Sequence, residues 1–116
     1  MDPVRSQLDS AYGRPARPPF PERPAEIRAA LDGRLTRAAA FELRGTLAAL
    51  ASRRPRTLVL DLRTVSVLDA SAVTSLRALD RRLAGAGGRL VVEAEGGVAR
   101  TLDRLGAGHL LAPARA

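Results

Sequence analysis

Apolar residues recur along this chain with the spacing of helices, and three stripes of this kind stand out. The first comprises Ala40, Leu43, Leu47 and Leu50. Spacings of three and four place these residues on one face of a helix that begins near Thr36 and ends before Pro55. Two further stripes predict a second and a third helix, and they comprise Val73, Leu76, Leu79 and Leu83, and then Val98, Leu102 and Leu105. Glycines between residues 85 and 88 end the second helix.

Short apolar runs between these stripes predict strands. Residues 57–62, TLVLDL, are apolar almost throughout, which is typical of a strand covered on both faces of a sheet. Residues 89–94 repeat this pattern, whereas residues 25–31 alternate more loosely and lead into the turn pair Asp32-Gly33. Leu110-Leu111 is a candidate for a final short strand. Because strands and helices alternate, we expect one α/β domain: a sandwich of a mostly parallel, four- to five-stranded sheet and about three helices.

The first 24 residues follow neither period. They hold six of the eight prolines of the chain, so they can form neither a helix nor a central strand. We interpret residues 1–24 as an extended, mostly disordered arm, with a short edge strand near residues 3–8 left open. The folded domain is then expected at residues 25–112, followed by a tail at residues 113–116.

The composition argues against a nucleic-acid partner despite a net charge of +7. Every basic residue is arginine, and the arginines are scattered rather than gathered into a stripe. One cluster, Arg53-Arg54-Pro55-Arg56, lies at the predicted end of a helix, where positive charge is favourable. Aromatic residues make up 3% of the chain, so no row of rings is available for stacking on bases.

The sequence also lacks the residues that a metal site, a membrane span or an enzyme active site would need. The chain has no cysteine and a single histidine, His109, which we expect to be structural or exposed rather than a metal ligand or a catalytic base. No apolar run approaches the roughly 20 residues that span a bilayer. We therefore expect a cytoplasmic, non-enzymatic domain with no cofactor, no metal and no direct membrane insertion.

The turn Asp69-Ala70-Ser71-Ala72 is the best candidate for a functional site. It joins a predicted strand to the second helix, at the carboxyl edge where open parallel sheets place their binding residues. Ser71 stands at or near the first helical position, where its hydroxyl can cap a backbone N–H and where a phosphate would be favoured. Alternatives stay open for both residues: Ser71 is a simple cap or a regulatory residue, and Asp69 either pairs with a backbone N–H or has a functional role, in which it orients the serine or contacts a partner.

Residues 25–111 resemble the STAS domain, which bacterial anti-sigma factor antagonists share with the cytoplasmic parts of sulfate transporters. The resemblance is carried by LVLDL, VSVLDASA, GAGGRLVVEA and LDRLGAGHLLAP, in that order. The family has Asp-Ser-Ser-Gly where this chain has Asp69-Ala70-Ser71-Ala72. Ser71 therefore falls on the serine that is phosphorylated in many members, while alanines replace the first serine and the glycine.

The resemblance implies a partner-switching protein. The unmodified domain would bind an anti-sigma factor with GHKL-type serine kinase activity, and phosphorylation of Ser71 would end this binding. The partner-binding surface would comprise Asp69, Ala70, Ser71, Ala72, Thr74, Ser75 and Arg77. Two alternatives remain: a STAS accessory subunit of a membrane transporter that docks on its ATPase, and an unmodified scaffold in a signalling assembly.

Overall fold

The computed structural model describes residues 23–113, and these form one α/β domain. Three strands, β1 (Glu26–Leu35), β2 (Thr57–Leu68) and β3 (Arg89–Glu93), pair in the order β1-β2-β3, and both pairs are parallel. Three helices alternate with them: α1 (Ala40–Ser52), α2 (Ala70–Gly85) and α3 (Gly96–Arg104). Single 3₁₀ turns, η1 (Arg37–Ala39) and η2 (Gly108–Leu110), precede α1 and follow α3.

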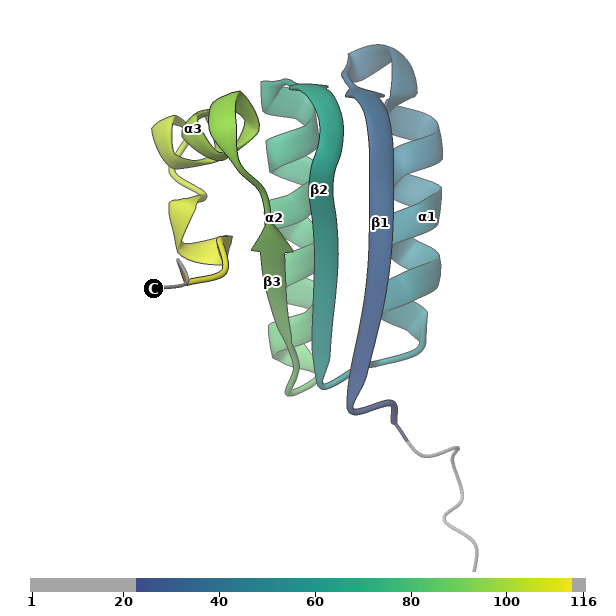
Figure 1. Cartoon of the computed structure of the whole chain (residues 1–116). Coiled ribbons are helices and arrows are strands. Elements are labelled where there is room, and N and C mark those ends of the chain that lie inside the picture. The colour runs from purple at the N-terminus through teal and green to yellow at the C-terminus, as the bar shows by residue number, and fades with distance from the viewer. Residues whose placement is uncertain (1–22, 114–116) are drawn as a thin grey trace, which may run out of the picture.

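The helices α1 and α2 lie side by side against one face of the sheet, and α3 lies beside the upper end of β2 (Figure 1). The face of β2 toward the helices carries Leu58, Leu60 and Leu62, none of which is exposed. They pack with the predicted stripes of the helices, including Leu43, Leu76 and Leu102. The three helices predicted from these stripes are therefore confirmed.

The opposite face of the sheet is charged, which corrects the expectation that the strand at residues 57–62 is covered on both sides. Side chains alternate along a strand, so Asp61 and Arg63 of β2 point away from the helices. Arg63 binds the Asp61 carboxylate at 2.9 Å, and Arg28 of β1 reaches Glu93 of β3 at 2.9 Å. Val59, which is also on this side of β2, is buried. Ion pairs thus lie on the face of the sheet that the helices leave free.

The expected count of four to five strands is wrong for the described residues, which contain three. Leu111, expected in a final strand, makes a single parallel bridge to Val92, and the backbone N–H of Ala112 donates to the Val92 carbonyl at 2.8 Å. The 3₁₀ turn before it and Pro113 after it leave no room for a longer ladder. The possible edge strand near residues 3–8 lies outside the described residues.

Two strands run further than the sequence indicates. β1 continues through the expected turn at Asp32-Gly33, with shifts of register on either side, and Gly33 adopts a φ of 77° that side chains disfavour. β2 continues beyond the apolar run at residues 57–62 as far as Leu68, and Val65 and Leu68 of this extension are buried. Both extensions bring the ends of β1 and β2 to the same edge, directly before η1 and α2.

Candidate functional site

Asp69 organises the turn between β2 and α2. It is the N-cap residue of α2, with extended backbone angles, and its carboxylate accepts from the backbone N–H of Ala72 at 3.1 Å. Ser71 is the second residue of the helix, and its hydroxyl donates to Asp69 Oδ1 at 2.6 Å. The interpretation of Ser71 as a simple cap is therefore wrong, because Asp69 is the N-cap residue and its carboxylate makes the capping hydrogen bond. The hydroxyl of Ser71 is held by a carboxylate instead.

The same carboxylate also reaches the neighbouring turn. The backbone N–H of Arg37, the first residue of η1, donates to Asp69 Oδ2 at 2.8 Å. The backbone N–H of Asp69 in turn donates to the carbonyl of Leu35, the last residue of β1, at 3.2 Å. The hydrogen bond from Ser71 and those from backbone N–H groups lower the pKa of Asp69, although burial opposes them. Asp69 therefore ties two strand-to-helix turns together as an ionised group.

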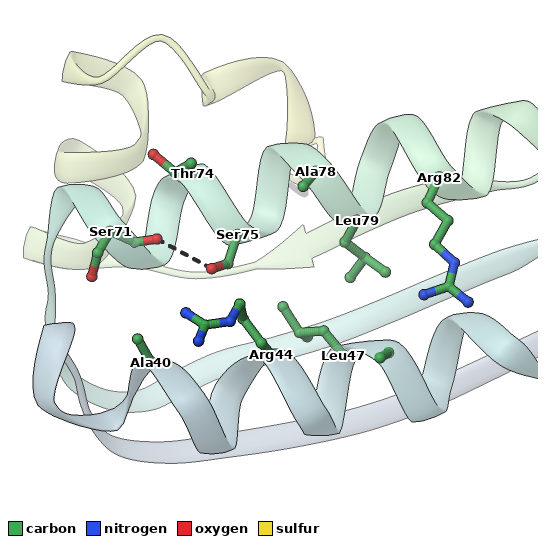
Figure 2. Close-up of a pocket in the computed structure, with 10 residues that line it drawn as sticks. Ala40, Arg44, Leu47, Ser71, Thr74, Ser75, Ala78, Leu79 and Arg82 are labelled. Atoms are coloured by element: carbon green, nitrogen blue, oxygen red, sulfur yellow. Dashed lines mark hydrogen bonds between the residues drawn. The ribbon is translucent and has the colours of Figure 1, made fainter.

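Ser71 lies at one end of a groove between α1 and α2 with a volume of about 610 Å³. Figure 2 shows side chains from both helices directed into this groove. Apolar side chains form much of its lining, with hydroxyl groups on the α2 side and an arginine from each helix. The lining comprises Ala40, Arg44, Leu47, Ala48, Ser71, Thr74, Ser75, Ala78, Leu79 and Arg82. The groove is suited to a partner or ligand with an apolar side and negative charge.

The residues predicted for partner binding divide between this groove and the surface next to it. Ser71, Thr74 and Ser75 line the groove, while Ala70, Thr74 and Arg77 line a second hollow of about 400 Å³ toward Leu105. The guanidinium of Arg77 donates to the Leu105 carbonyl, which joins α2 to the end of α3. Ala72 is 1% exposed and packs in the core, so its side chain supports the surface from below rather than lining it.

The site residues predicted from the sequence include none from α1. Arg44, Leu47 and Ala48 line the groove opposite α2, and Arg82 closes its far end (Figure 2). The signal in the sequence for this side of the groove is the pair of small residues Ala40 and Ala48, which lie four residues on either side of Arg44 on α1. A helix that faces water on this side ordinarily carries more charge.

His109 does not belong to the site. Its side chain is 63% exposed, and Nε2 lies 3.9 Å from the carboxylate of Asp80 on α2. Asp80 is nine residues beyond Ser71 on the same helix, which is about 13 Å along the helix axis at 1.5 Å per residue. The expectation of an exposed histidine is confirmed. Among residues 23–113, no helix is long and apolar enough to cross a membrane.

These observations define a parallel α/β domain in which a polar turn at one edge of the sheet lies at the end of a groove between two helices. A family model described as "Mlab, STAS domain" matches residues 20–112. The chain belongs to the STAS domain family, whose members are generally non-enzymatic binding modules. This confirms the resemblance found in the sequence. Among curated proteins, none matches the chain significantly.

Solved structures with the same fold include regulators and a transporter domain. An anti-sigma factor antagonist from Mycobacterium paratuberculosis is 23% identical, with a TM-score of 0.70 over 81% of this chain and 82% of its own. The unphosphorylated anti-sigma factor antagonist SpoIIAA is 17% identical, with a TM-score of 0.59 over 83% and 86%. The STAS domain of a SulP transporter from Vibrio cholerae is 22% identical, with a TM-score of 0.56 over 86% and 74%. At these identities the likeness concerns the fold.

Proposed function

We propose that this chain is an anti-sigma factor antagonist that regulates transcription in the cytoplasm by partner switching. Its partner is an anti-sigma factor with GHKL-type serine kinase activity, which docks on the first turns of α2. Asp69, Ala70, Ser71, Thr74, Ser75 and Arg77 form the docking surface, and Ala72 supports it from the core. The observation that carries the proposal is the Ser71 hydroxyl, held 2.6 Å from Asp69 at the end of an open groove.

Phosphorylation of Ser71 is the switch in this proposal. Ser71 Oγ forms a bond to the γ-phosphorus of ATP bound to the kinase, the bond between that phosphorus and ADP breaks, and the hydroxyl proton is released to solvent. The hydrogen bond from Ser71 to Asp69 is lost with the proton. A phosphate adds nearly two negative charges next to an ionised carboxylate, so the two groups repel each other. The docking surface changes its charge while the core of the domain is untouched.

The test compares two substitutions at Ser71. The partner is captured with the Ser71→Ala variant, identified by mass spectrometry, purified, and titrated by calorimetry. Ser71→Asp is expected to weaken binding about 100-fold, because it places a charge in a desolvated contact, whereas Ser71→Ala stays within about threefold of the wild type. Ser52→Asp is the matched control, since it adds the same charge at the far end of α1. Equal binding by Ser71→Asp and Ser71→Ala would contradict the switch.

A second candidate function is a STAS accessory subunit of a membrane transporter that docks on its ATPase. The matching family model carries the Mlab description, and a SulP transporter domain shares the fold. In this role Ser71 contacts the partner without being phosphorylated, which suits a motif with alanine at positions 70 and 72. The same capture experiment separates the two candidates. An ATPase as the specific partner, with Ser71 unmodified in the cell, favours the accessory subunit.

A further inference from the structure

The charge in the groove between α1 and α2 is entirely positive. Arg44 from α1 and Arg82 from α2 are its charged lining residues, and no carboxylate lines it. Figure 2 shows the Arg44 guanidinium directed toward the end of the groove where Ser71 and Ser75 lie, whereas Arg82 lies at the opposite end. The two arginines therefore share one groove but differ in their distance from the phosphorylation candidate.

Arg44 has no polar partner among residues 23–113. Arg28 and Arg63 of the sheet, by contrast, each bind a carboxylate at 2.9 Å. Arg44 is exposed on the surface of α1, where it also lines a second hollow together with Glu42 and Gly45. An unpaired guanidinium keeps all of its N–H donors available, and two of them can bind one phosphate group in parallel.

A phosphate on Ser71 cannot keep the position that the hydroxyl now holds. Ser71 Oγ lies 2.6 Å from Asp69 Oδ1 as a donor, and a phosphoserine oxygen has no proton to donate at neutral pH. Rotation about the Cα–Cβ bond moves the group between staggered positions. Because Ser71 lines the groove, one direction away from the carboxylate leads toward Arg44.

We propose that Arg44 binds the phosphate of phosphorylated Ser71 and holds it in the groove between α1 and α2. The proposal rests on the phosphorylation of Ser71 proposed above. The charged groups that face Ser71 are Asp69 from the turn and Arg44 from α1, and the backbone N–H of Arg37 is bound to the same carboxylate. Phosphorylation thus moves Ser71 from a partner in the turn between β2 and α2 to a partner on α1, and it fills the end of the groove that a docking protein would enter.

The test uses the full chain with phosphoserine placed at position 71 by an expanded genetic code, so no kinase is needed. The ³¹P chemical shift is followed from pH 4 to pH 9, and it reports the second pKa of the phosphoserine. A cation beside the phosphate favours its dianion, so Arg44→Gln is expected to raise this pKa by about 0.5. Arg82→Gln is the matched control, with the same loss of charge at the far end of the groove, and is expected to leave the pKa unchanged.

Each outcome bears on a different part of the proposal. No change in Arg44→Gln, or an equal change in Arg82→Gln, would overturn the role of Arg44. If phosphoserine at position 71 prevents partner binding but Arg44→Gln leaves the second pKa of the phosphoserine unchanged, the switch is supported and Arg44 does not bind the phosphate. If Arg44→Gln shifts the titration but Ser71→Asp still binds the partner, the contact exists and the proposed switch fails.

Discussion

The two strand-to-helix turns at the carboxyl edge of β1 and β2 are neighbours, yet they are built differently. The turn before α2 carries its own cap, because Asp69 accepts from the backbone N–H of Ala72. The turn before η1 starts at Thr36, whose backbone is extended like that of a cap but whose side chain makes no capping hydrogen bond. The N–H of Arg37 is bound instead by Asp69 from the other turn.

One carboxylate therefore serves two turns, and the serine proposed as the switch is bonded to that carboxylate. A change in the charge at Ser71 acts first on the bond to Asp69 and then on a group that also holds the start of η1. This arrangement couples the first turn of α2 to the segment that leads into α1. The two helices that form the groove are joined at the same end as Ser71.

Replacement of Asp69 is expected to have the largest effect on stability. Asp69→Ala removes the cap of α2, the partner of the Ser71 hydroxyl and the acceptor for the Arg37 N–H together. Loss of a helix cap and of a further charge-assisted hydrogen bond is expected to lower the melting temperature by about 10 °C in a domain of this size. Thermal unfolding followed by circular dichroism measures this change.

Thr36→Ala is the matched control for this comparison. It also removes a polar side chain at a cap position, but one with no capping hydrogen bond to lose. We expect its melting temperature to stay within about 2 °C of the wild type. If Asp69→Ala and Thr36→Ala lower the melting temperature equally, the view that Asp69 supports both turns is wrong.

Asp69→Asn tests the two turns independently, because it is expected to keep the cap of α2 and to lose the contact with Arg37. Asparagine is a good N-cap, and its single side-chain oxygen can still accept from Ala72. Its amide group must then face the N–H of Arg37, donor against donor, because the two contacts use different oxygens of the carboxylate. We expect a loss of about 5 °C, with faster hydrogen exchange at Arg37 and unchanged exchange at Ala72. Faster exchange at both amides would contradict this division.

The sequence predicts the helical part of the fold well, because burial of one helix face leaves a direct pattern. Leu43 and Leu47 of α1, and Leu76 and Leu83 of α2, are buried as their spacing predicts. Strand length was predicted less well. β2 extends to Leu68 because its second half pairs with residues 32–35 of β1, and pairing of this kind depends on a segment some thirty residues away in the chain.

The candidate functional site, like the fold, could be predicted from the sequence only in part. The turn at residues 69–72 could be located from the sequence, since parallel strands bring such turns to one edge. The sequence could not predict which residue caps α2, because Asp69 and Ser71 are both good capping residues. Only the geometry decides between them. Arg44 could not be predicted either, since its relation to Ser71 arises from the packing of α1 beside α2.

The smallest expected effect concerns the protonation of Asp69. The hydrogen bond from the Ser71 hydroxyl is the largest cause of its lowered pKa, so Ser71→Ala is expected to raise the pKa of Asp69 toward its ordinary value. A pH titration of the Asp69 carboxyl carbon by NMR measures this change. Asp61 is the control within the same molecule, because Arg63 holds its pKa at about 2 and does not contact Ser71.

This shift also sets the sign of the change in acid stability. A carboxyl whose pKa is lower in the folded than in the unfolded chain adds stability above the unfolded pKa of about 4, and this stability is lost as the pH falls through the folded pKa. Ser71→Ala brings the two values closer together, so it is expected to lose less stability than the wild type on going from pH 5 to pH 2. Urea unfolding at several pH values tests this. A steeper acid dependence in Ser71→Ala would show that the Ser71 hydroxyl does not favour the ionised form of Asp69.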